Sequence, residues 1–230
     1  MTYIIAEPCV DMVCIGEGEK ALLDVCQAIE VGSPLDSIPN IWHRSEQGIT
    51  RNKAGSTLML DELPIPDYDI WPKKMLYRPM QGKIRLTVGI ETQRGCPFTC
   101  AFCNSPSQND FYKKEIGKTY HRRKSIRKIK KELDYLTKKF KPELIYWVAD
   151  TFLAMPEYEW DEFHEMYLDY KIPFWMNTRI ETITKKRIKQ LEEMNALRFN
   201  IGIEHGNYQF RKEVILRRTT NERLIKQFKI

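Results

Sequence analysis

The sequence lacks any long apolar run free of charged residues, and its mean hydropathy is −0.50. This excludes a membrane-spanning helix of the usual length. The first eight residues also lack the basic segment with which secretory signal peptides begin, and they contain an acid and a proline. We therefore expect a cytoplasmic protein. Hydrophobic residues make up 42% of the 230 residues, which is enough to bury a core.

A strong imbalance of charge is also missing, because 37 basic residues face 31 acidic ones, a net charge of +6. The basic excess is local: residues 113–141 contain 13 Lys or Arg and 3 Asp or Glu. Such a stretch could bind the phosphates of RNA. Aromatic residues are not interleaved with it as base stacking would require. A small-molecule substrate is therefore the first hypothesis, and an RNA-binding face over 113–141 is the alternative.

The six cysteines form two groups. Cys9, Cys14 and Cys26 occupy positions in a predicted strand and a predicted helix, and we expect them to be small buried hydrophobic residues. Cys96, Cys100 and Cys103 instead follow the spacing C-x3-C-x2-C. A chain this long does not need a framework of disulfides, so the clustered thiols are interpreted as metal ligands.

Two kinds of metal site fit three clustered thiolates, which suit both iron–sulfur clusters and zinc. Three thiolates can hold three irons of a cubane and leave the fourth iron open to another ligand, whereas most structural clusters use four cysteines. A zinc site would need a distant fourth ligand such as His121. The lack of a fourth cysteine nearby favours a catalytic 4Fe–4S cluster, with a non-catalytic zinc- or cluster-binding module as the alternative.

From residue 84 onward the sequence alternates between strand and helix patterns. Strands are predicted at 84–92, 144–148, 173–178 and 198–204, and helices at 125–140, 157–170, 184–195 and from about 209. Ser125 is the expected N-cap of the first of these helices. This order predicts an α/β fold with a partial parallel (β/α) barrel.

In such barrels the chemistry lies at the carboxyl ends of the strands. Besides the three cysteines, Asp150, Asn177, Arg179 and Glu204 occupy such positions. Glu204 is the strongest of these site candidates. Asp150 could contact a ligand or cap the next helix. Asn177 and Arg179 could face the lumen and bind a carboxylate, although a surface position is preferred for Arg179.

The residues before 84 are less regular. A buried strand at 9–15, a glycine turn and a helix with its apolar face on Leu22, Leu23, Cys26 and Ile29 predict one βα unit. Six prolines between residues 32 and 82 predict a connector, with short strands near 40–43 and around residue 49.

Residues 92–103, Thr-Gln-Arg-Gly-Cys-Pro-Phe-Thr-Cys-Ala-Phe-Cys, resemble the signature of the radical S-adenosylmethionine (SAM) superfamily, in which an aromatic residue, here Phe102, precedes the last cysteine. Four further segments resemble the branch of that superfamily with a cobalamin-binding domain; they are residues 10–19, 60–67, 122–125 and 201–206. By this resemblance, residues 1–31 are the remnant of a Rossmann-like cobalamin-binding domain, 32–83 an interdomain linker and 84–230 the first four βα units of the radical SAM barrel.

The resemblance implies a mechanism. A 4Fe–4S cluster on Cys96, Cys100 and Cys103 would bind SAM and cleave it reductively, and the resulting radical would start chemistry on a substrate, including methyl transfer. Phe102 would lie beside the adenine, and Glu204 and Asp150 would also contact SAM. The electron would come from a donor such as flavodoxin or ferredoxin.

The resemblance also implies what this chain lacks. The cobalamin domain of the family begins with an Asp-x-His-x-x-Gly motif that no residue before Val10 supplies, and the barrel has more strands than the four counted here. We therefore expect the chain to be truncated at both ends and, alone, to bind cobalamin weakly or not at all.

Overall fold

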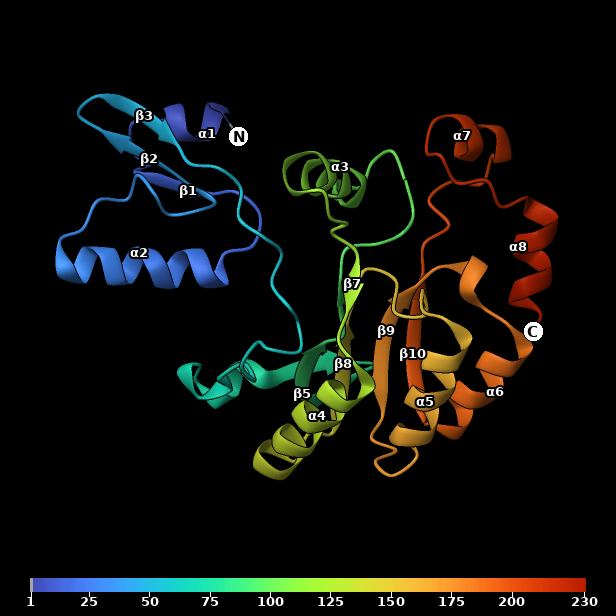
Figure 1. Ribbon diagram of the computed structural model, residues 1–230. Coiled ribbons are helices and arrows are strands. Elements are labelled where there is room, and N and C mark those ends of the chain that lie inside the picture. The colour runs from blue at the N-terminus through green and yellow to red at the C-terminus, as the bar shows by residue number, and fades with distance from the viewer. Residues whose placement is uncertain (1) are drawn as a thin grey trace. The chain divides into compact units, whose positions relative to one another are not determined.

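The computed structural model describes residues 2–230, which fall into two compact units (Figure 1). The first unit ends at Met59 and also includes Asp110–Thr119; the second comprises Leu60–Asn109 and Tyr120–Ile230. Helix α3 (Asn104–Ile116) is divided between them. Within the described residues, no helix is both long and apolar enough to cross a bilayer.

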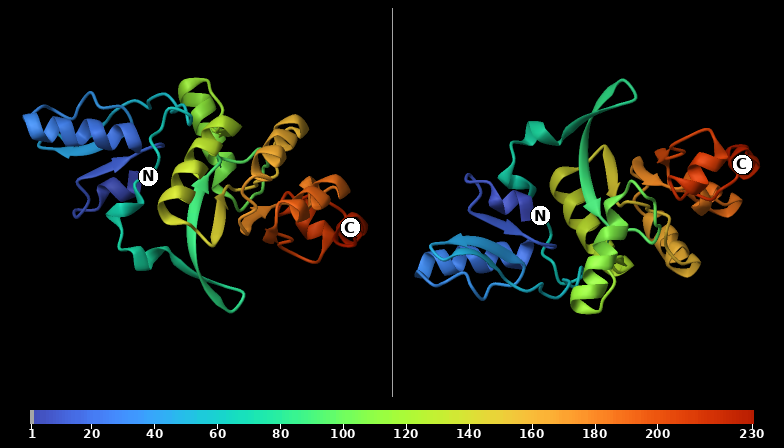
Figure 2. Two further views of the ribbon diagram at one scale, coloured as in Figure 1. Left: turned by 90° about the horizontal axis from the view of Figure 1, so that it is seen from below. Right: turned by 90° about the horizontal axis from the view of Figure 1, so that it is seen from above.

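The first unit is a small antiparallel sheet with a helix beside it (Figure 2). Its elements are α1 (Thr2–Ala6), β1 (Met12–Cys14), α2 (Glu19–Val31), β2 (Ile41–Ser45) and β3 (Gly48–Arg51). The strands pair in the order β1-β2-β3. The two short strands expected near residues 40–43 and 49 are therefore present, and they pair with each other across the turn before Gly48.

The buried face of α2 is the opposite of the predicted one. Ala21, Val25 and Ala28 pack on Ile38 and Ile41. Leu22, Leu23 and Ile29 are exposed, as are Cys9, Cys14 and Cys26. The prediction that these three cysteines are buried was wrong, because small side chains let the helix approach the sheet and the larger apolar stripe faces outward. Strand β1 is likewise short and mostly exposed rather than buried.

The second unit is built on one five-stranded sheet in the order β10-β9-β8-β5-β4. Strands β5 (Lys83–Glu91), β8 (Leu144–Val148), β9 (Phe174–Thr178) and β10 (Ala196–Ile201) run parallel, as predicted. Strand β4 (Tyr77–Met80) adds an antiparallel edge strand. It was not predicted, because the prolines of this region indicated a connector. A two-stranded ribbon of β6 (Gln93–Arg94) and β7 (Arg122–Arg123) stands beside the sheet.

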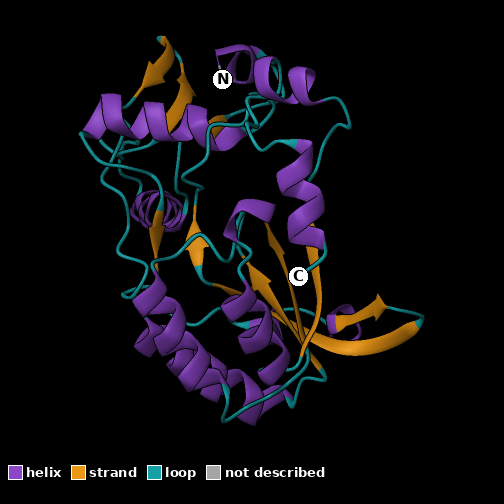
Figure 3. Cartoon of the chain, turned by 90° about the vertical axis from the view of Figure 1, so that its right-hand side faces the viewer, coloured by secondary structure: helices purple, strands orange, loops and turns teal. Residues whose placement is uncertain are grey.

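Helices cover one face of this sheet, as Figures 1 and 3 show. They are α4 (Ile126–Phe140), α5 (Glu157–Tyr167) and α6 (Lys185–Glu193), and the shorter α7 (Tyr208–Glu213) and α8 (Asn221–Phe228) follow β10. The Ser125 hydroxyl caps α4 by accepting a hydrogen bond from the Lys128 N–H at 3.1 Å. The order of strand and helix confirms an α/β half-barrel.

Alternation along the strands separates core from cavity. Ile145 and Trp147 of β8 belong to the core under the helices, whereas Tyr146 and Val148 line a cavity on the opposite face. Successive strand residues point to opposite faces of a sheet, so this period of two is expected. The sheet therefore has one face packed on helices and one available to a ligand.

The predicted linker over 32–83 is shared between the units, since residues up to 59 pack in the first and residues from 60 in the second. Tyr68 of this second part packs its ring edge-on against Phe140. The interpretation of 1–31 as a remnant of a cobalamin-binding domain stays a prediction.

Candidate active site

A cavity of about 760 Å³ lies at the carboxyl ends of the parallel strands of the second unit. Residues from the cysteine loop, from α3 and from the ends of β5, β8, β9 and β10 line it. All six site residues expected from the sequence are among them: Cys96, Cys100, Phe102, Cys103, Asp150 and Glu204. Parallel strands bring their carboxyl ends to one edge, so residues far apart in the sequence share one site.

The cysteine loop is held by a glycine and an asparagine. Gly95 has φ +74°, a left-handed conformation that suits glycine. Asn109 donates from Nδ2 to the Cys96 carbonyl at 3.2 Å and accepts from the Tyr120 and His121 N–H groups at 3.0 and 3.2 Å. This single side chain therefore fixes the start of the loop to the segment that leads into β7.

Each cysteine sulfur of the loop has its own polar neighbour. The Cys96 Sγ lies 3.3 Å from the Thr151 hydroxyl, and the Cys103 Sγ accepts from the Ser105 N–H at 3.4 Å. The Cys100 Sγ accepts from Arg179 Nη1 at 2.7 Å. Burial raises the pKa of the Cys96 thiol, and the bond from Thr151 partly offsets this. A metal that binds there must displace the thiol proton.

Arg179 lines the cavity; of the two positions left open for it, the preferred one at the surface was wrong. It is 6% exposed, and its guanidinium lies 4.0 Å from the centre of the Phe98 ring. Its Nη2 and Nε donate to the Glu181 carboxylate at 2.6 and 3.1 Å. Burial alone would raise the pKa of Glu181, but the bonds from Arg179 and from the Thr219 hydroxyl outweigh it and lower that pKa to about 2.

Glu204 and Phe102 are joined by an arginine that sequence reasoning missed. Arg217 Nη2 lies 3.0 Å from Glu204 Oε1, and the same guanidinium lies 5.7 Å from the centre of the Phe102 ring. Glu204 has φ +70°, and its carboxylate folds back over Gly202, where a Cβ would lie 2.2 Å from Oε1. Gly202 is therefore what allows Glu204 to reach Arg217.

Asp150 does not cap the next helix, since Pro156 occupies that position. Its carboxylate accepts from the Ser105 hydroxyl at 3.0 Å instead, and both residues line the cavity. Of the two roles left open for Asp150, the role of helix N-cap is thus excluded, and contact with a ligand stays a prediction. Asn177 also lines the cavity, and it donates to the Tyr146 hydroxyl at 3.1 Å and accepts from Asn200 at 3.1 Å.

The three thiols of the loop are soft donors, which suit iron–sulfur clusters. Each thiolate of a cubane binds a different iron, so the three sulfurs surround a space rather than meet at a point. Between residues 2 and 230, no three His, Cys, Asp or Glu side chains converge as a single ion requires. His121 is not among the residues that line the cavity of the three cysteines. Three soft donors on one cavity wall suit a 4Fe–4S cluster.

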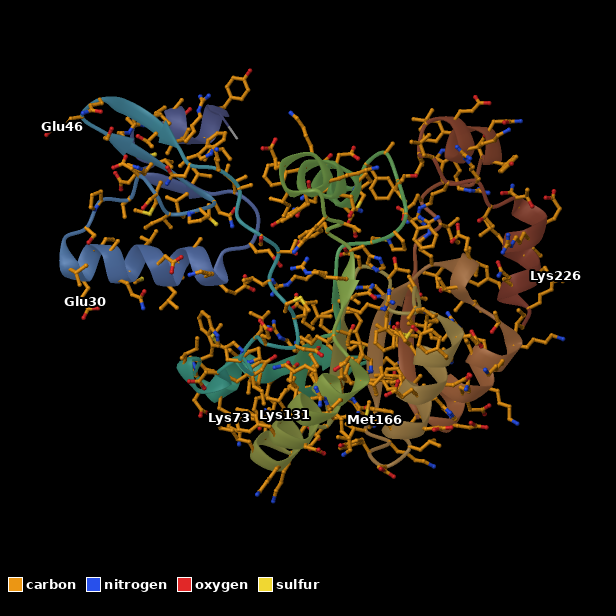
Figure 4. The ribbon with its side chains drawn as sticks, viewed as in Figure 1. Glu30, Glu46, Lys73, Lys131, Met166 and Lys226 are labelled. Carbon is orange, nitrogen blue, oxygen red and sulfur yellow. The ribbon has the colours of Figure 1, made fainter. Side chains whose placement is uncertain are left out.

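The basic stretch 113–141 is divided between the two units at residues 119 and 120. In the second unit its lysines are mostly paired: Lys124 and Lys128 with Glu132, Lys130 with Asp134, and Lys139 with Asp69. Lys131 lies on the exposed face of α4 (Figure 4). These ion pairs engage four of the 13 basic residues of the stretch, and an RNA-binding face stays a prediction.

Gly95 provides a test of the loop. A Cβ at this residue would lie 2.8 Å from Tyr120 Cδ1 and 3.2 Å from the His121 backbone. We expect Gly95→Ala to lower stability by about 1–3 kcal/mol and to reduce the iron bound after reconstitution, because the loop must move. Gly82 is the matched control, since its φ is also +74° but nothing lies within 4 Å of its Cβ position. Equal iron content in both variants would contradict this account.

The fold and the site define the class: a half-barrel with a three-cysteine loop and a ligand cavity at the carboxyl ends of its strands. The model of the radical SAM superfamily matches residues 90–230. The chain belongs to this superfamily of enzymes, whose cofactors are a 4Fe–4S cluster and SAM. The resemblance drawn from the cysteine motif is therefore confirmed.

Curated relatives cover most of this chain. An uncharacterized methyltransferase of Pyrococcus horikoshii is 30% identical over 205 residues, which are 87% of this chain and 41% of that protein. The anaerobic magnesium-protoporphyrin IX monomethyl ester cyclase of Rubrivivax gelatinosus is 24% identical over 94% of this chain and 38% of its own length. The chain thus spans about two fifths of these relatives.

Two solved structures share the fold. The cobalamin-dependent SAM radical enzyme OxsB, with aqua-cobalamin and SAM bound, matches 94% of this chain and 31% of its own at a TM-score of 0.68 and 24% identity. The radical SAM methyltransferase TsrM of Kitasatospora setae, with cobalamin and a 4Fe–4S cluster, matches 95% of this chain and 44% of its own at 0.63 and 15% identity. The neighbours are thus cobalamin-dependent radical SAM enzymes.

Proposed function

We propose that this chain binds a 4Fe–4S cluster through Cys96, Cys100 and Cys103 and uses it to cleave SAM reductively. The observation that carries the proposal is the shared cavity: the three cysteines, Phe102, Asp150 and Glu204 line it together. When bound, the cluster supplies an open iron for SAM and the electron for the cleavage. An external one-electron donor, such as flavodoxin or ferredoxin, provides that electron.

The chain's own residues position SAM. Phe102 is 61% exposed, so one face of its ring is free to stack on an adenine. The Glu204 carboxylate accepts hydrogen bonds from the ribose hydroxyls or the amino group of SAM, while Arg217 fixes its direction. Asp150 adds a second carboxylate across the same cavity, oriented by Ser105.

The outcome of the radical step is proposed at the level of a reaction class. Methyl transfer is the first candidate to assay, because the relative that is 30% identical is named a methyltransferase. The cyclase among the relatives gives a different outcome. The substrate is a small molecule that enters the 760 Å³ cavity. Cobalamin binding by this chain alone is not part of the proposal.

Glu204 tests the SAM site separately from the cluster. We expect Glu204→Ala to weaken SAM binding by about tenfold or more, because a charged acceptor contributes about 1.5–3 kcal/mol. The iron content should not change, since the carboxylate of Glu204 pairs with Arg217 and not with a cysteine. Equilibrium dialysis of SAM against anaerobically reconstituted protein measures the effect.

The matched control is Glu213→Ala, an exposed carboxylate on α7 outside the cavity. It should bind SAM as the unmodified chain does. Equal SAM affinity for Glu204→Ala and Glu213→Ala would remove Glu204 from the site. If the unmodified chain holds iron but does not bind SAM, the proposed reaction is contradicted.

A further inference from the structure

Arg179 makes an unusual contact for a buried arginine, since one of its N–H groups points at a cysteine sulfur. The Nη1 to Cys100 Sγ distance is 2.7 Å, and the arginine side chain is 7% exposed. We propose that Arg179 is a positioning residue that makes the cluster easier to reduce by donating this hydrogen bond to the Cys100 thiolate. This inference rests on the proposed function, because it requires Cys100 to be a cluster ligand.

The guanidinium is fixed on three sides. Nε and Nη2 bind the two oxygens of Glu181, and the planar face lies over the Phe98 ring. Nη1 is thereby left pointing at Cys100. Because these contacts hold the guanidinium, its Nη1–H donor is already directed at the Cys100 sulfur before the cluster is reduced. Reduction therefore requires no reorientation of Arg179.

A relay of hydrogen bonds holds Glu181 in turn. The Thr219 hydroxyl donates to Glu181 Oε1 at 2.7 Å, and the Thr219 carbonyl accepts from Arg211 Nη2 at 3.0 Å. Arg211 is 2% exposed and also donates to the His205 carbonyl at 2.7 Å. Residues of the loop after β10 and of the segment after β9 therefore together orient the Arg179 side chain.

The electrostatic effect has a definite sign. One-electron reduction adds negative charge to the cluster and its thiolate sulfurs. A hydrogen bond to such a sulfur stabilises the reduced form more than the oxidised form. Glu181 lies on the far side of the guanidinium, so the Arg179–Glu181 pair presents its positive end to Cys100. Loss of Arg179 must therefore make reduction harder.

Arg179→Gln removes the cation and shortens the side chain. At a fixed solution potential without SAM, we expect the ratio of reduced to oxidised cluster to fall by about tenfold, equivalent to about 59 mV for a one-electron couple. Arg179→Lys keeps the charge but lacks the forked geometry, and we expect a fall of about threefold. Both are measured by anaerobic titration with dithionite and redox mediators, followed by electron paramagnetic resonance.

Arg123→Gln is the matched control. Arg123 also donates twice to a carboxylate, that of Glu159 at 2.7 and 2.9 Å, and it lies outside the cysteine cavity. Its loss removes the same charge, so the ratio should stay at that of the unmodified chain. An equal fall in Arg123→Gln would mean that net charge, and not the bond to Cys100, sets the potential, and would overturn the proposal.

Iron and sulfide content separates the possible failures. If the unmodified chain holds no cluster, the proposed function fails and this inference falls with it. If Arg179→Gln holds a full cluster at an unchanged potential, the inference alone is overturned. If Arg179→Gln loses its iron, the reduction potential of the cluster in Arg179→Lys tests the inference instead. If Arg179→Lys also loses its iron, Arg179 is needed for cluster assembly and the inference is overturned.

Discussion

Cys100→Ser is expected to lose the cluster and to abolish the formation of 5′-deoxyadenosine from SAM. The hydroxyl still accepts a hydrogen bond from Arg179, so the surrounding contacts survive. It is a hard, weakly basic donor, however, and iron–sulfur clusters require thiolates. We expect iron per chain to fall at least severalfold and the dithionite-driven product to fall below detection.

The chain carries its own control for this experiment. Cys26 is exposed on α2, far from the cavity in sequence, and it makes none of the contacts that surround Cys100. Cys26→Ser should therefore retain iron, sulfide and activity. Iron and sulfide are measured after anaerobic reconstitution, and 5′-deoxyadenosine is measured by chromatography. One zinc per chain without sulfide, or full iron in Cys100→Ser, would contradict the cluster assignment.

The place of the three cysteines in the cavity could be predicted because their spacing is local. C-x3-C-x2-C needs no tertiary information, and a strand before it suffices to place it at the end of a barrel strand. Glu204 could be placed by the same rule, although the left-handed backbone that directs its carboxylate could not. The parallel course of the four strands followed from the alternation of strand and helix patterns, and their pairing confirms it.

The arginines were harder to place because charge alone predicts exposure. Arg179 did carry a signal: it stands two residues after Asn177, so the period of two puts both on the cavity face. Arg217 carried none, since it lies in a loop and meets Glu204 only through the fold of the backbone at Gly202. Arg179 is buried and Arg217 half-buried because of the groups they contact in the fold, and neighbouring residues in the sequence do not indicate those groups.

The face of α2 was predicted wrongly for a related reason. Hydrophobic periodicity identifies an apolar stripe but not the surface that covers it. Leu22 and Ile29 form the larger stripe, yet Ala21, Val25 and Ala28 pack on the sheet because small side chains permit close approach. In α4 the same reasoning succeeded, since Ile129, Leu133 and Leu136 all lie in the core.

Glu132 of helix α4 belongs to a buried ion-pair network, although the sequence around it is strongly basic. Lys124 Nζ donates to both oxygens of Glu132 at 2.8 and 2.9 Å, and the two side chains are 3% and 1% exposed. Lys128 Nζ lies 3.6 Å from Glu132 Oε1 and donates to the Leu63 carbonyl. Glu132 therefore holds two buried cations and, through Lys128, the chain segment before the sheet.

Glu132→Gln is accordingly expected to destabilise the protein by about 3–5 kcal/mol, because it leaves two buried ammonium groups without a counter-charge. For a domain of this size the midpoint of thermal unfolding should fall by about 6–20 °C. Urea unfolding followed by the fluorescence of Trp147 and Trp160, both in the core of the same unit, measures the change.

Asp134→Asn separates burial from charge, since Asp134 lies on the same helix but pairs with Lys130 at the surface, where the two side chains are 53% and 47% exposed. Water solvates that pair, so its loss should matter far less. The triple variant Lys124→Met, Lys128→Met and Glu132→Leu should recover much of the stability lost in Glu132→Gln, because it removes all three buried charges rather than one partner. If Glu132→Gln is no less stable than Asp134→Asn, the buried network does not stabilise the fold, and the packing of Ile129 and Leu133 alone must hold α4 on the sheet.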